Sequence, residues 1–271
     1  MKVGYQGEER SYSHQAVTDL YPKAEAVGLH GFAEAFTALA DGSVDLLVVP
    51  IENSTTGSIL EVLKGLATAD ASIVAEHYGR IRHALLGLPS AKPADIRRVL
   101  SHPEALAQAH ETLTVRGWEP VAVPDTAGAV RLVAEDHDPT QAALAPPDAR
   151  RRYGLKVLLS DVVDRDHNAT RFVALAPGPP CAGPDDNKSS ISFSTAHSPG
   201  ALALALTELG LRGANLTRIE SRPGRTAWSY RFYVDLLHEP GPAGLARILD
   251  PPPHSIDDLH ILGTYRAARR S

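Results

Sequence analysis

Apolar runs and helical patterns alternate along the first two thirds of the chain. The apolar runs predict strands at residues 2–6, 45–51, 96–100, 120–123, 141–145 and 156–163. Capping residues and apolar residues at helical spacing predict helices that begin at Ser11 and His102 and that span 32–40 and 127–135. Such alternation is typical of a mostly parallel sheet with helices on both faces. We therefore expect an α/β fold for this part.

Two segments show these patterns most clearly. The run 45–51 is continuously apolar, which is typical of a strand that is buried on both faces. The helix at 32–40 ends at Asp41 and Gly42 and has one apolar face. The residues that we expect on that face are Phe32, Phe36, Leu39 and Ala40.

A segment rich in proline and glycine, 176–184, interrupts the alternation and extends into the polar residues 185–188. It favours neither helix nor strand and is typical of a linker. We therefore predict a first domain at 1–177, a linker at 178–188 and a second domain at 189–271.

The second domain has its own order of elements. Strands are predicted at 190–194, 215–221, 228–237 and 259–265, and helices at 201–209 and 244–249. Ser198 and Pro199 are expected to start the first of these helices, and Gly210 to end it. Its buried face is expected to contain Leu202, Leu206 and Leu209. The order βαββαβ predicts a ferredoxin-like fold.

Composition narrows the class of protein. The formal charge of −5 disfavours nucleic acid and anionic membranes as partners. The single cysteine, Cys181, excludes an internal disulfide framework and fits a reducing compartment. The N-terminus has no apolar leader, and no apolar run approaches the roughly 18 residues that span a bilayer. We expect a cytoplasmic protein.

Polar residues follow several predicted strands at the point where a helix begins. They are Ser11, Ser13, Glu52, Asn53, Ser54, Thr55, Ser101, His102, Asp125 and Thr126. Ligands of open α/β sheets bind at the carboxyl ends of the strands, and helix N-termini favour anions. Each residue taken alone is also explained as a helix cap, and for His102 capping and catalysis are equally good interpretations.

Residues 168–172 form a second polar segment, in which Asn168, Thr170 and Arg171 precede an apolar run. The arginine fork is suited to bind a carboxylate through two hydrogen bonds. The sequence contains no GxGxxG, P-loop, HxxxH or HExxH pattern. We therefore expect no cofactor and no metal.

Together these motifs resemble prephenate dehydratases with a C-terminal ACT regulatory domain. The segments that carry the resemblance are 5–8, 11–13, 50–54, 102–108, 125–129, 153–155, 168–172, 199–202 and 215–223. They follow the order of the family over nearly the whole chain. One departure is Arg10, which stands where the family usually has glycine or another small residue.

The resemblance implies a two-lobed catalytic domain, similar to type II periplasmic binding proteins, with the active site between the lobes. The implied reaction converts prephenate to phenylpyruvate, carbon dioxide and water in L-phenylalanine biosynthesis, without a cofactor. Alternatives on the same scaffold are a prephenate decarboxylase, an arogenate dehydratase and a non-enzymatic small-molecule sensor. The segment Thr170-Arg171-Phe172 argues against the decarboxylase.

The resemblance also implies roles for individual residues. The hydroxyl of Thr170 is expected to donate a hydrogen bond to the departing ring oxygen, and Arg171 to bind a carboxylate. Glu52 and His102 are alternative acids, Glu52 is equally explained as a structural partner of Arg171, and Phe172 positions its neighbours. The expected substrate-binding residues are Ser11, Ser13, Asn53, Ser54, Thr55, Thr126 and Asn168.

The second domain is expected to bind L-phenylalanine as an inhibitor between paired subunits, in a homodimer or homotetramer. The expected effector residues are Gly200, Ala201, Leu202, Glu220, Ser221, Arg222 and Pro223.

Overall fold

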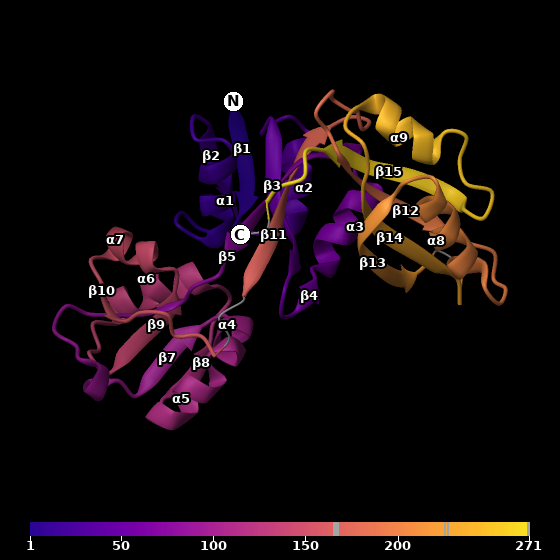
Figure 1. Ribbon diagram of the computed structural model, residues 1–271. Helices are drawn as coiled ribbons and strands as arrows, with labels where there is room; N and C mark the ends of the chain where they lie inside the picture. Colours follow the sequence, from indigo (N-terminus) through magenta and orange to yellow (C-terminus); the bar gives the residue numbers. More distant parts are fainter. Residues whose placement is uncertain (165–167, 225, 227, 270–271) are drawn as a thin grey trace. The chain divides into compact units, whose positions relative to one another are not determined.

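The computed structural model describes residues 1–164, 168–224, 226 and 228–269, and it is drawn in Figure 1. The other residues fall inside the predicted domains and lie outside this description. One compact unit comprises Met1–Gly65 and His77–Phe172, and the second comprises Leu66–Glu76 and the chain from Val173 onward. The chain passes between the units three times, between Gly65 and Leu66, within strand β5 (Ala71–Arg80) and within strand β11 (Ala169–Pro177). The domain boundaries derived from the linker stay a prediction.

The first unit contains two sheets, each with its own helices, which we call lobes. In the first lobe, β1 (Lys2–Gln6) pairs in parallel with both β2 (Glu25–Leu29) and β3 (Leu46–Asn53). Helices α1 (Tyr12–Leu20) and α2 (Phe32–Ala40) connect these strands. The short strand β4 (Gly57–Ser58) pairs with the end of β3, and α3 (Leu60–Thr68) follows it.

Local predictions in this lobe are confirmed with one correction. Leu47, Val48 and Val49 in β3 are fully buried, as the apolar run predicted. In α2, however, the expected buried residue Ala40 is exposed, and Phe32 and Phe36 are half-buried. The buried stripe is instead Ala35, Ala38 and Leu39, because small side chains allow the helix to approach the sheet closely.

The second lobe has the strand order β10-β6-β9-β7-β8. These strands are β6 (Ala84–Gly87), β7 (Arg98–Ser101), β8 (Glu119–Ala122), β9 (Gln141–Ala145) and β10 (Lys156–Leu159). The helices are α4 (Pro103–Gln108), α5 (His110–Arg116), α6 (Thr126–Asp136) and α7 (Arg150–Tyr153). Short 3₁₀ segments lie at Pro93–Asp95 and Pro147–Ala149.

The expectation of a mostly parallel sheet is only partly right for this lobe. Strand β7 is parallel to β8 and β9, whereas β6 is antiparallel to β9 and β10. The predicted strand at 156–163 is also too long, because β10 ends at Leu159.

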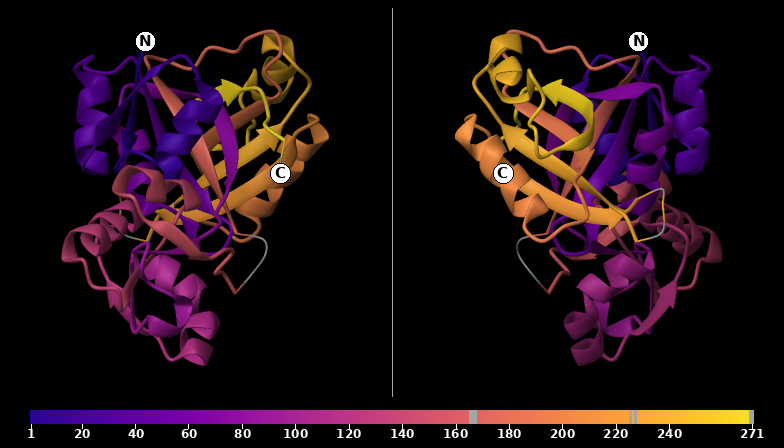
Figure 2. Two further views of the ribbon diagram at one scale, coloured as in Figure 1. Left: turned by 90° about the vertical axis from the view of Figure 1, so that its left-hand side faces the viewer. Right: turned by 90° about the vertical axis from the view of Figure 1, so that its right-hand side faces the viewer.

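The second unit confirms the predicted order βαββαβ. It contains β12 (Lys188–Ser194), α8 (Ala201–Leu211), β13 (Asn215–Pro223), β14 (Tyr230–Leu237), α9 (Pro242–Leu249) and β15 (Asp257–Tyr265). The antiparallel order β13-β14-β12-β15 is that of a ferredoxin-like sheet. Both helices pack on one face of this sheet, around Ile191, Phe193 and Leu236 (Figure 2).

The predicted first residue of α8, Ala201, is confirmed, but its predicted capping residues and its predicted end are wrong. The helix begins after Gly200, whose φ of 81° lies in the left-handed region, so Ser198 and Pro199 precede the helix. Gly210 lies inside the helix, which continues to Leu211. Its predicted buried face is confirmed for Leu209, and Leu202 and Leu206 are half-buried. Among the described residues, no helix is long and apolar enough to span a bilayer.

Within the second unit, Gly263 allows a close approach between β15 and β5. It pairs in parallel with Ile73, and a Cβ atom at this position would lie 2.3 Å from the backbone oxygen of Ile73. Because that oxygen belongs to the backbone, a side-chain rotation cannot relieve the contact.

Replacing Gly263 by alanine should therefore lower the thermal unfolding temperature, since overpacking costs about 1–3 kcal/mol. The matched control is Gly210→Ala in α8, where nothing lies within 4 Å of the new Cβ. This control should be neutral or stabilising by up to about 1 kcal/mol, because alanine favours helices. Calorimetry of both variants checks the expectation, and an unchanged unfolding temperature for Gly263→Ala would contradict it.

Candidate active site

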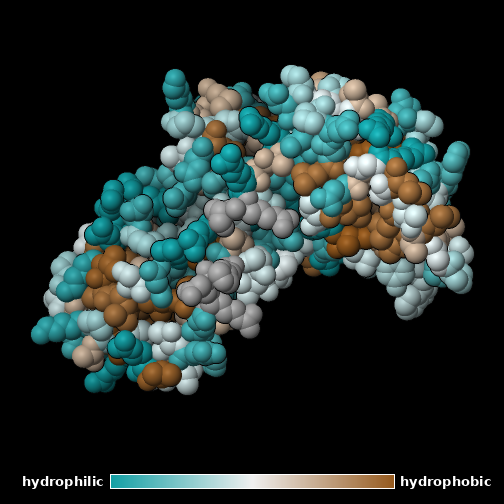
Figure 3. All heavy atoms as spheres, viewed as in Figure 1, coloured by the Kyte–Doolittle hydropathy of each residue, from teal (hydrophilic) through white to brown (hydrophobic). Residues whose placement is uncertain are grey.

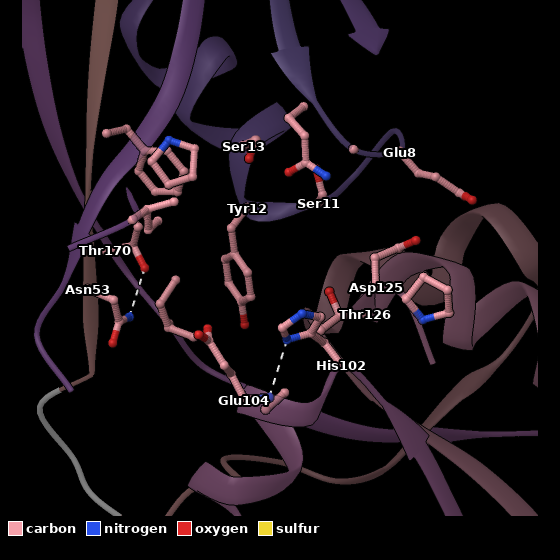
Figure 4. A pocket seen from close by; sticks show the side chains of 18 of the residues that line it. Glu8, Ser11, Tyr12, Ser13, Asn53, His102, Glu104, Asp125, Thr126 and Thr170 are labelled. Carbon is pink, nitrogen blue, oxygen red and sulfur yellow. Dashed lines mark hydrogen bonds between the residues drawn. The ribbon is translucent and has the colours of Figure 1, made fainter. Parts of the chain in front are cut away.

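A pocket of about 360 Å³ lies between the two lobes of the first unit. The first lobe contributes the turn between β1 and α1, the end of β3 and the start of β11. The second lobe contributes the first turns of α4 and α6 (Figure 4). The predicted site residues that line it are Ser11, Ser13, Asn53, His102, Thr126, Thr170 and Phe172.

A network of amide hydrogen bonds fixes the orientation of Asn53. Its side-chain oxygen accepts hydrogen bonds from the backbone N–H groups of Thr55 and Thr56, at 2.9 and 3.1 Å. A backbone N–H can only donate, so the amide nitrogen of Asn53 must point the other way. It donates to Asn168 Oδ1 at 2.8 Å. It also donates to Thr170 Oγ1 at 3.0 Å, as Figure 4 shows.

This orientation decides which way the Thr170 hydroxyl donates. Because Thr170 Oγ1 accepts the hydrogen bond from Asn53, its hydrogen remains to be donated elsewhere. Among the described residues, the side chain has no other hydrogen-bond partner. Thr170 is 8% exposed, and its exposed part faces the pocket. The hydroxyl is therefore a directed donor toward a bound molecule.

The pleat of strands β3 and β11 divides the predicted catalytic residues into two groups. Successive side chains of a strand point to opposite faces. Thr170 and Phe172 line the pocket, whereas Arg171 between them is buried, with its Nη1 atom 3.9 Å from Glu52 Oε2. Glu52 precedes Asn53 in β3 and likewise does not line the pocket. The geometry matches the alternative in which Glu52 is the structural partner of Arg171.

The helix N-termini contribute caps as well as pocket residues. Ser11 caps α1 by accepting the His14 backbone N–H at 3.3 Å, and Asp125 caps α6 by accepting that of Gly128 at 2.6 Å. His102 Nδ1 accepts the Glu104 backbone N–H at 3.2 Å, so the capping interpretation of His102 is confirmed. A catalytic role for His102 stays a prediction.

The remaining predicted substrate-binding residues lie beside the pocket. Ser54 joins the ends of β3 and β11 by hydrogen bonds with the backbone of Ala169. Thr55 and Asn168 line a neighbouring cavity of about 300 Å³. Asn168 nevertheless connects the lobes, because its Nδ2 atom donates to Gln108 Oε1 at 2.6 Å.

Three residues of this network were not predicted from the sequence. Tyr12, His83 and Gln108 all line the pocket, and His83 Nε2 lies 3.3 Å from Gln108 Oε1. His83 Nδ1 lies 3.2 Å from the Tyr12 hydroxyl, which donates to the Arg82 backbone oxygen. Gln108 could have been predicted as a site residue, because it is the last residue of the segment 102–108 that resembles the family. His83 could not have been predicted in this way, because it lies in no motif and in no predicted helix or strand.

Burial controls the protonation of two of these groups. His83 is 3% exposed, and burial lowers its pKa to about 4, although the Gln108 hydrogen bond opposes the shift. Burial raises the pKa of Tyr12. Both side chains are therefore neutral near pH 7.

Arg10, which stands where the family usually has glycine or another small residue, adopts a backbone conformation that explains this preference. Its φ of 70° lies in the left-handed region that favours glycine. Its Nε atom is buried without a hydrogen-bond partner in the described structure, and it lies 3.8 Å from Glu9 Oε1. Within the described ranges, no group of three or more His, Cys, Asp or Glu side chains is placed to hold a metal ion.

Fold and pocket together define a two-lobed α/β protein that binds a small molecule between its lobes. The chain belongs to the prephenate dehydratase family, whose model matches residues 3–179. It is 34% identical over 98% of its length to a bifunctional N-acyl-homoserine lactone acylase/prephenate dehydratase of Komagataeibacter europaeus, of which it covers 96%.

Two further proteins are similar over most of the chain. An arogenate dehydratase/prephenate dehydratase of Arabidopsis thaliana is 42% identical over 87% of this chain, which spans 65% of that protein. A crystal structure of prephenate dehydratase from Arthrobacter aurescens in complex with L-Phe has a TM-score of 0.86 and 27% identity. It covers 99% of this chain, and this chain covers 90% of it.

The lowered pKa of His83 should make stability depend on pH. As the pH falls from about 6.5 toward 4, the unfolded chain binds a proton that the buried imidazole does not, so the free energy of unfolding should decrease. The loss for this group is on the order of 2 kcal/mol at pH 4.5. Urea unfolding at pH 7 and 4.5 measures it.

The variant His83→Gln should lose less stability between these pH values than the native protein. His254→Gln is the control, because His254 is exposed and lies in the second unit. Equal pH dependence in His83→Gln and the native protein would show that His83 is not the titrating group.

Proposed function

We propose that this chain is a prephenate dehydratase. The observation that carries the proposal is the Thr170 hydroxyl, which Asn53 orients so that it donates into a pocket between two lobes. Membership of the family and the names of the similar proteins support it. The reaction removes the ring carboxylate as carbon dioxide and the ring hydroxyl, with one proton, as water.

The pocket supplies hydrogen bonds at the places where the reaction needs them. The C–C bond to the carboxylate breaks, and its electron pair makes the ring aromatic as the C–O bond breaks. An alcohol is a poor proton donor, so Thr170 stabilises the departing oxygen by a hydrogen bond. Of the two alternative acids, His102 lines the pocket and Glu52 does not.

The substrate carboxylates are bound by hydrogen-bond donors. Ser11 and Ser13 at the start of α1 and Thr126 at the start of α6 line the pocket, where helix N-termini favour anions. Gln108 accepts hydrogen bonds through its oxygen, which leaves its amide nitrogen as a further donor. Phe172 packs beside Thr170, and the buried Arg171 holds β11 against Glu52. Arg171 is thus a positioning residue in this proposal.

Removing the Thr170 hydroxyl should lower kcat with little change in KM, because the hydrogen bond strengthens in the transition state. Loss of one such donor reduces the rate by about 10²–10³-fold. Thr170→Ala is compared with Thr170→Ser, which retains the hydroxyl and should keep most of the activity. The measurement is phenylpyruvate formation from prephenate. A near-native kcat in folded Thr170→Ala would eliminate this role.

We also propose that the second unit is an ACT domain that binds L-phenylalanine as an inhibitor. Its fold is ferredoxin-like, and the similar Arthrobacter protein was crystallised with L-Phe. Ala201 and Leu202 line a cavity of about 320 Å³ together with Phe232, which suits an aromatic side chain. Gly200, in the left-handed conformation, positions the start of α8 beside this cavity.

The other proposed effector residues lie on β13, outside that cavity. Glu220 already pairs with Arg218 and Arg222, and Ser221 and Pro223 complete the segment. In this proposal, residues 220–223 contact the effector bound to a second copy of the chain. Apolar side chains gather on the visible surface of this unit (Figure 3). Exposed ones include Leu211, Ile219 and Tyr230, as pairing of copies in a homodimer or homotetramer requires.

Leu202→Ala should weaken inhibition by L-phenylalanine by about tenfold or more, because it removes part of the apolar wall. Leu204→Ala is the matched control, since Leu204 is 61% exposed on the same helix. Prephenate turnover without effector should be native in both variants. Calorimetry and inhibition assays measure the effect, and absence of L-phenylalanine binding by the native protein would end the effector proposal.

A further inference from the structure

Each ring nitrogen of His83 faces an oxygen atom that accepts hydrogen bonds and has no hydrogen to offer in return. His83 Nε2 lies 3.3 Å from Gln108 Oε1, a carbonyl oxygen that already accepts a hydrogen bond from Asn168 at 2.6 Å. His83 Nδ1 lies 3.2 Å from the hydroxyl oxygen of Tyr12, whose hydrogen is donated to the Arg82 backbone. A neutral imidazole has one N–H group and satisfies one of these contacts, whereas an imidazolium ion satisfies both.

Burial opposes the charged form that this geometry favours. The His83 side chain is 3% exposed, and burial lowers its pKa to about 4, although the hydrogen bond with Gln108 opposes the shift. The ring is therefore held between two opposing influences, its hydrogen-bond partners and the loss of solvent. A negative charge brought beside the ring shifts this balance, because an opposite charge within about 4–6 Å stabilises the ionised form of a side chain.

The pocket that His83 lines has no permanent cation among the described residues, because neither lysine nor arginine lines it. The titratable side chains of its lining are, within the described ranges, Glu8, Tyr12, His83, His102, Glu104 and Asp125. Arg82, next to His83, is exposed, lies 3.5 Å from Asp161 and is not part of the lining. Prephenate brings two further negative charges. Of these lining side chains, the two imidazoles are the ones that become positive on binding a proton.

We propose that His83 takes up a proton from solvent when the dicarboxylate substrate enters the pocket, and that the resulting imidazolium ion balances the substrate's negative charge. The inference rests on the proposed dehydratase function, because prephenate supplies the two carboxylates. The proton returns to solvent when the products leave.

The protonated ring acts on the substrate through its charge, because both of its N–H groups are used within the protein. It donates to Tyr12 in α1 of the first lobe and to Gln108 in α4 of the second. The same proton that balances the substrate's charge therefore also strengthens the contact between the lobes. His83 is thus a positioning residue, which acts on the substrate without a hydrogen bond to it.

The test measures proton uptake directly, with a pH-indicator dye in a stopped-flow instrument at pH 6. Thr170→Ala is the starting protein, because the slow turnover expected of it separates the binding of prephenate from the reaction, which itself consumes a proton. Binding of prephenate should take up about half a proton per site, because a nearby dianion raises the pKa of His83 toward the pH of the measurement. Phenylpyruvate has one carboxylate and should cause a smaller uptake.

Three further substitutions in Thr170→Ala assign the proton to one side chain. His83→Gln should abolish the uptake. Tyr12→Phe keeps the histidine but removes one acceptor of its ring, so the uptake should decrease. His102→Gln removes the other imidazole of the lining and should leave most of the uptake intact. Circular dichroism shows whether each variant is folded.

Uptake that persists in folded His83→Gln, or that disappears in His102→Gln, would overturn the proposal, because another group would then bind the proton. If His83→Gln does not fold, undiminished uptake in Tyr12→Phe overturns it instead. Equal uptake with phenylpyruvate would show that the proton does not answer the second carboxylate. Absence of rapid uptake in Thr170→Ala, while the native chain converts prephenate, would also refute it. A native chain that does not convert prephenate would refute the dehydratase function itself.

Discussion

The pocket depends on the single orientation available to the Asn53 amide. Two backbone N–H groups of the turn after β3 occupy its oxygen, and this fixes the direction of every later hydrogen bond. Asn168 accepts from Asn53 and donates to Gln108, and the Gln108 oxygen then faces His83 Nε2. The network begins in the first lobe and ends in the second, so it holds the pocket walls together.

Burial makes this network specific as well as stabilising. Asn53, Asn168 and His83 are all nearly inaccessible to solvent, where an unsatisfied polar group costs about 1–3 kcal/mol. A reversed amide would leave several groups unpaired at once, because each bond sets the direction of the next. The hydrogen bond from Asn53 sets the orientation of the Thr170 hydroxyl, whose own hydrogen has no acceptor among the described residues. Such preorganisation is what stabilisation of a departing oxygen requires.

The second unit uses buried polar groups in a different way. Lys188 bonds to both carboxylate oxygens of Glu76, at 2.7 and 3.0 Å, and both side chains are almost fully buried. Ser189 contacts His238 Nε2 at 2.9 Å, and Ser190 bonds to Asp235. These residues lie on β5, on β12 and on or directly after β14, and they line none of the pockets described above. They specify the pairing of strands, whereas the polar network of the first unit orients a reactive site.

The sequence by itself determined the local elements and the family. The bounds of β1, α2 and β9 agree with prediction, because a regular apolar pattern reports directly which residues of one element are buried. The order βαββαβ and the pocket positions of Thr170, Asn53 and Ser11 were likewise accessible from patterns and motifs.

Only the tertiary structure decided which side chains meet. The pleat of β11 turned Arg171 away from the pocket, although the motif groups it with Thr170. His83 lies in the connection between β5 and β6, and the burial of β5 itself shows no simple alternation that would predict this connection. Contacts such as His83 with Gln108 or Asn53 with Asn168 join segments 25 and 115 residues apart. Local periodicity describes burial within one element, whereas such contacts depend on how two lobes pack.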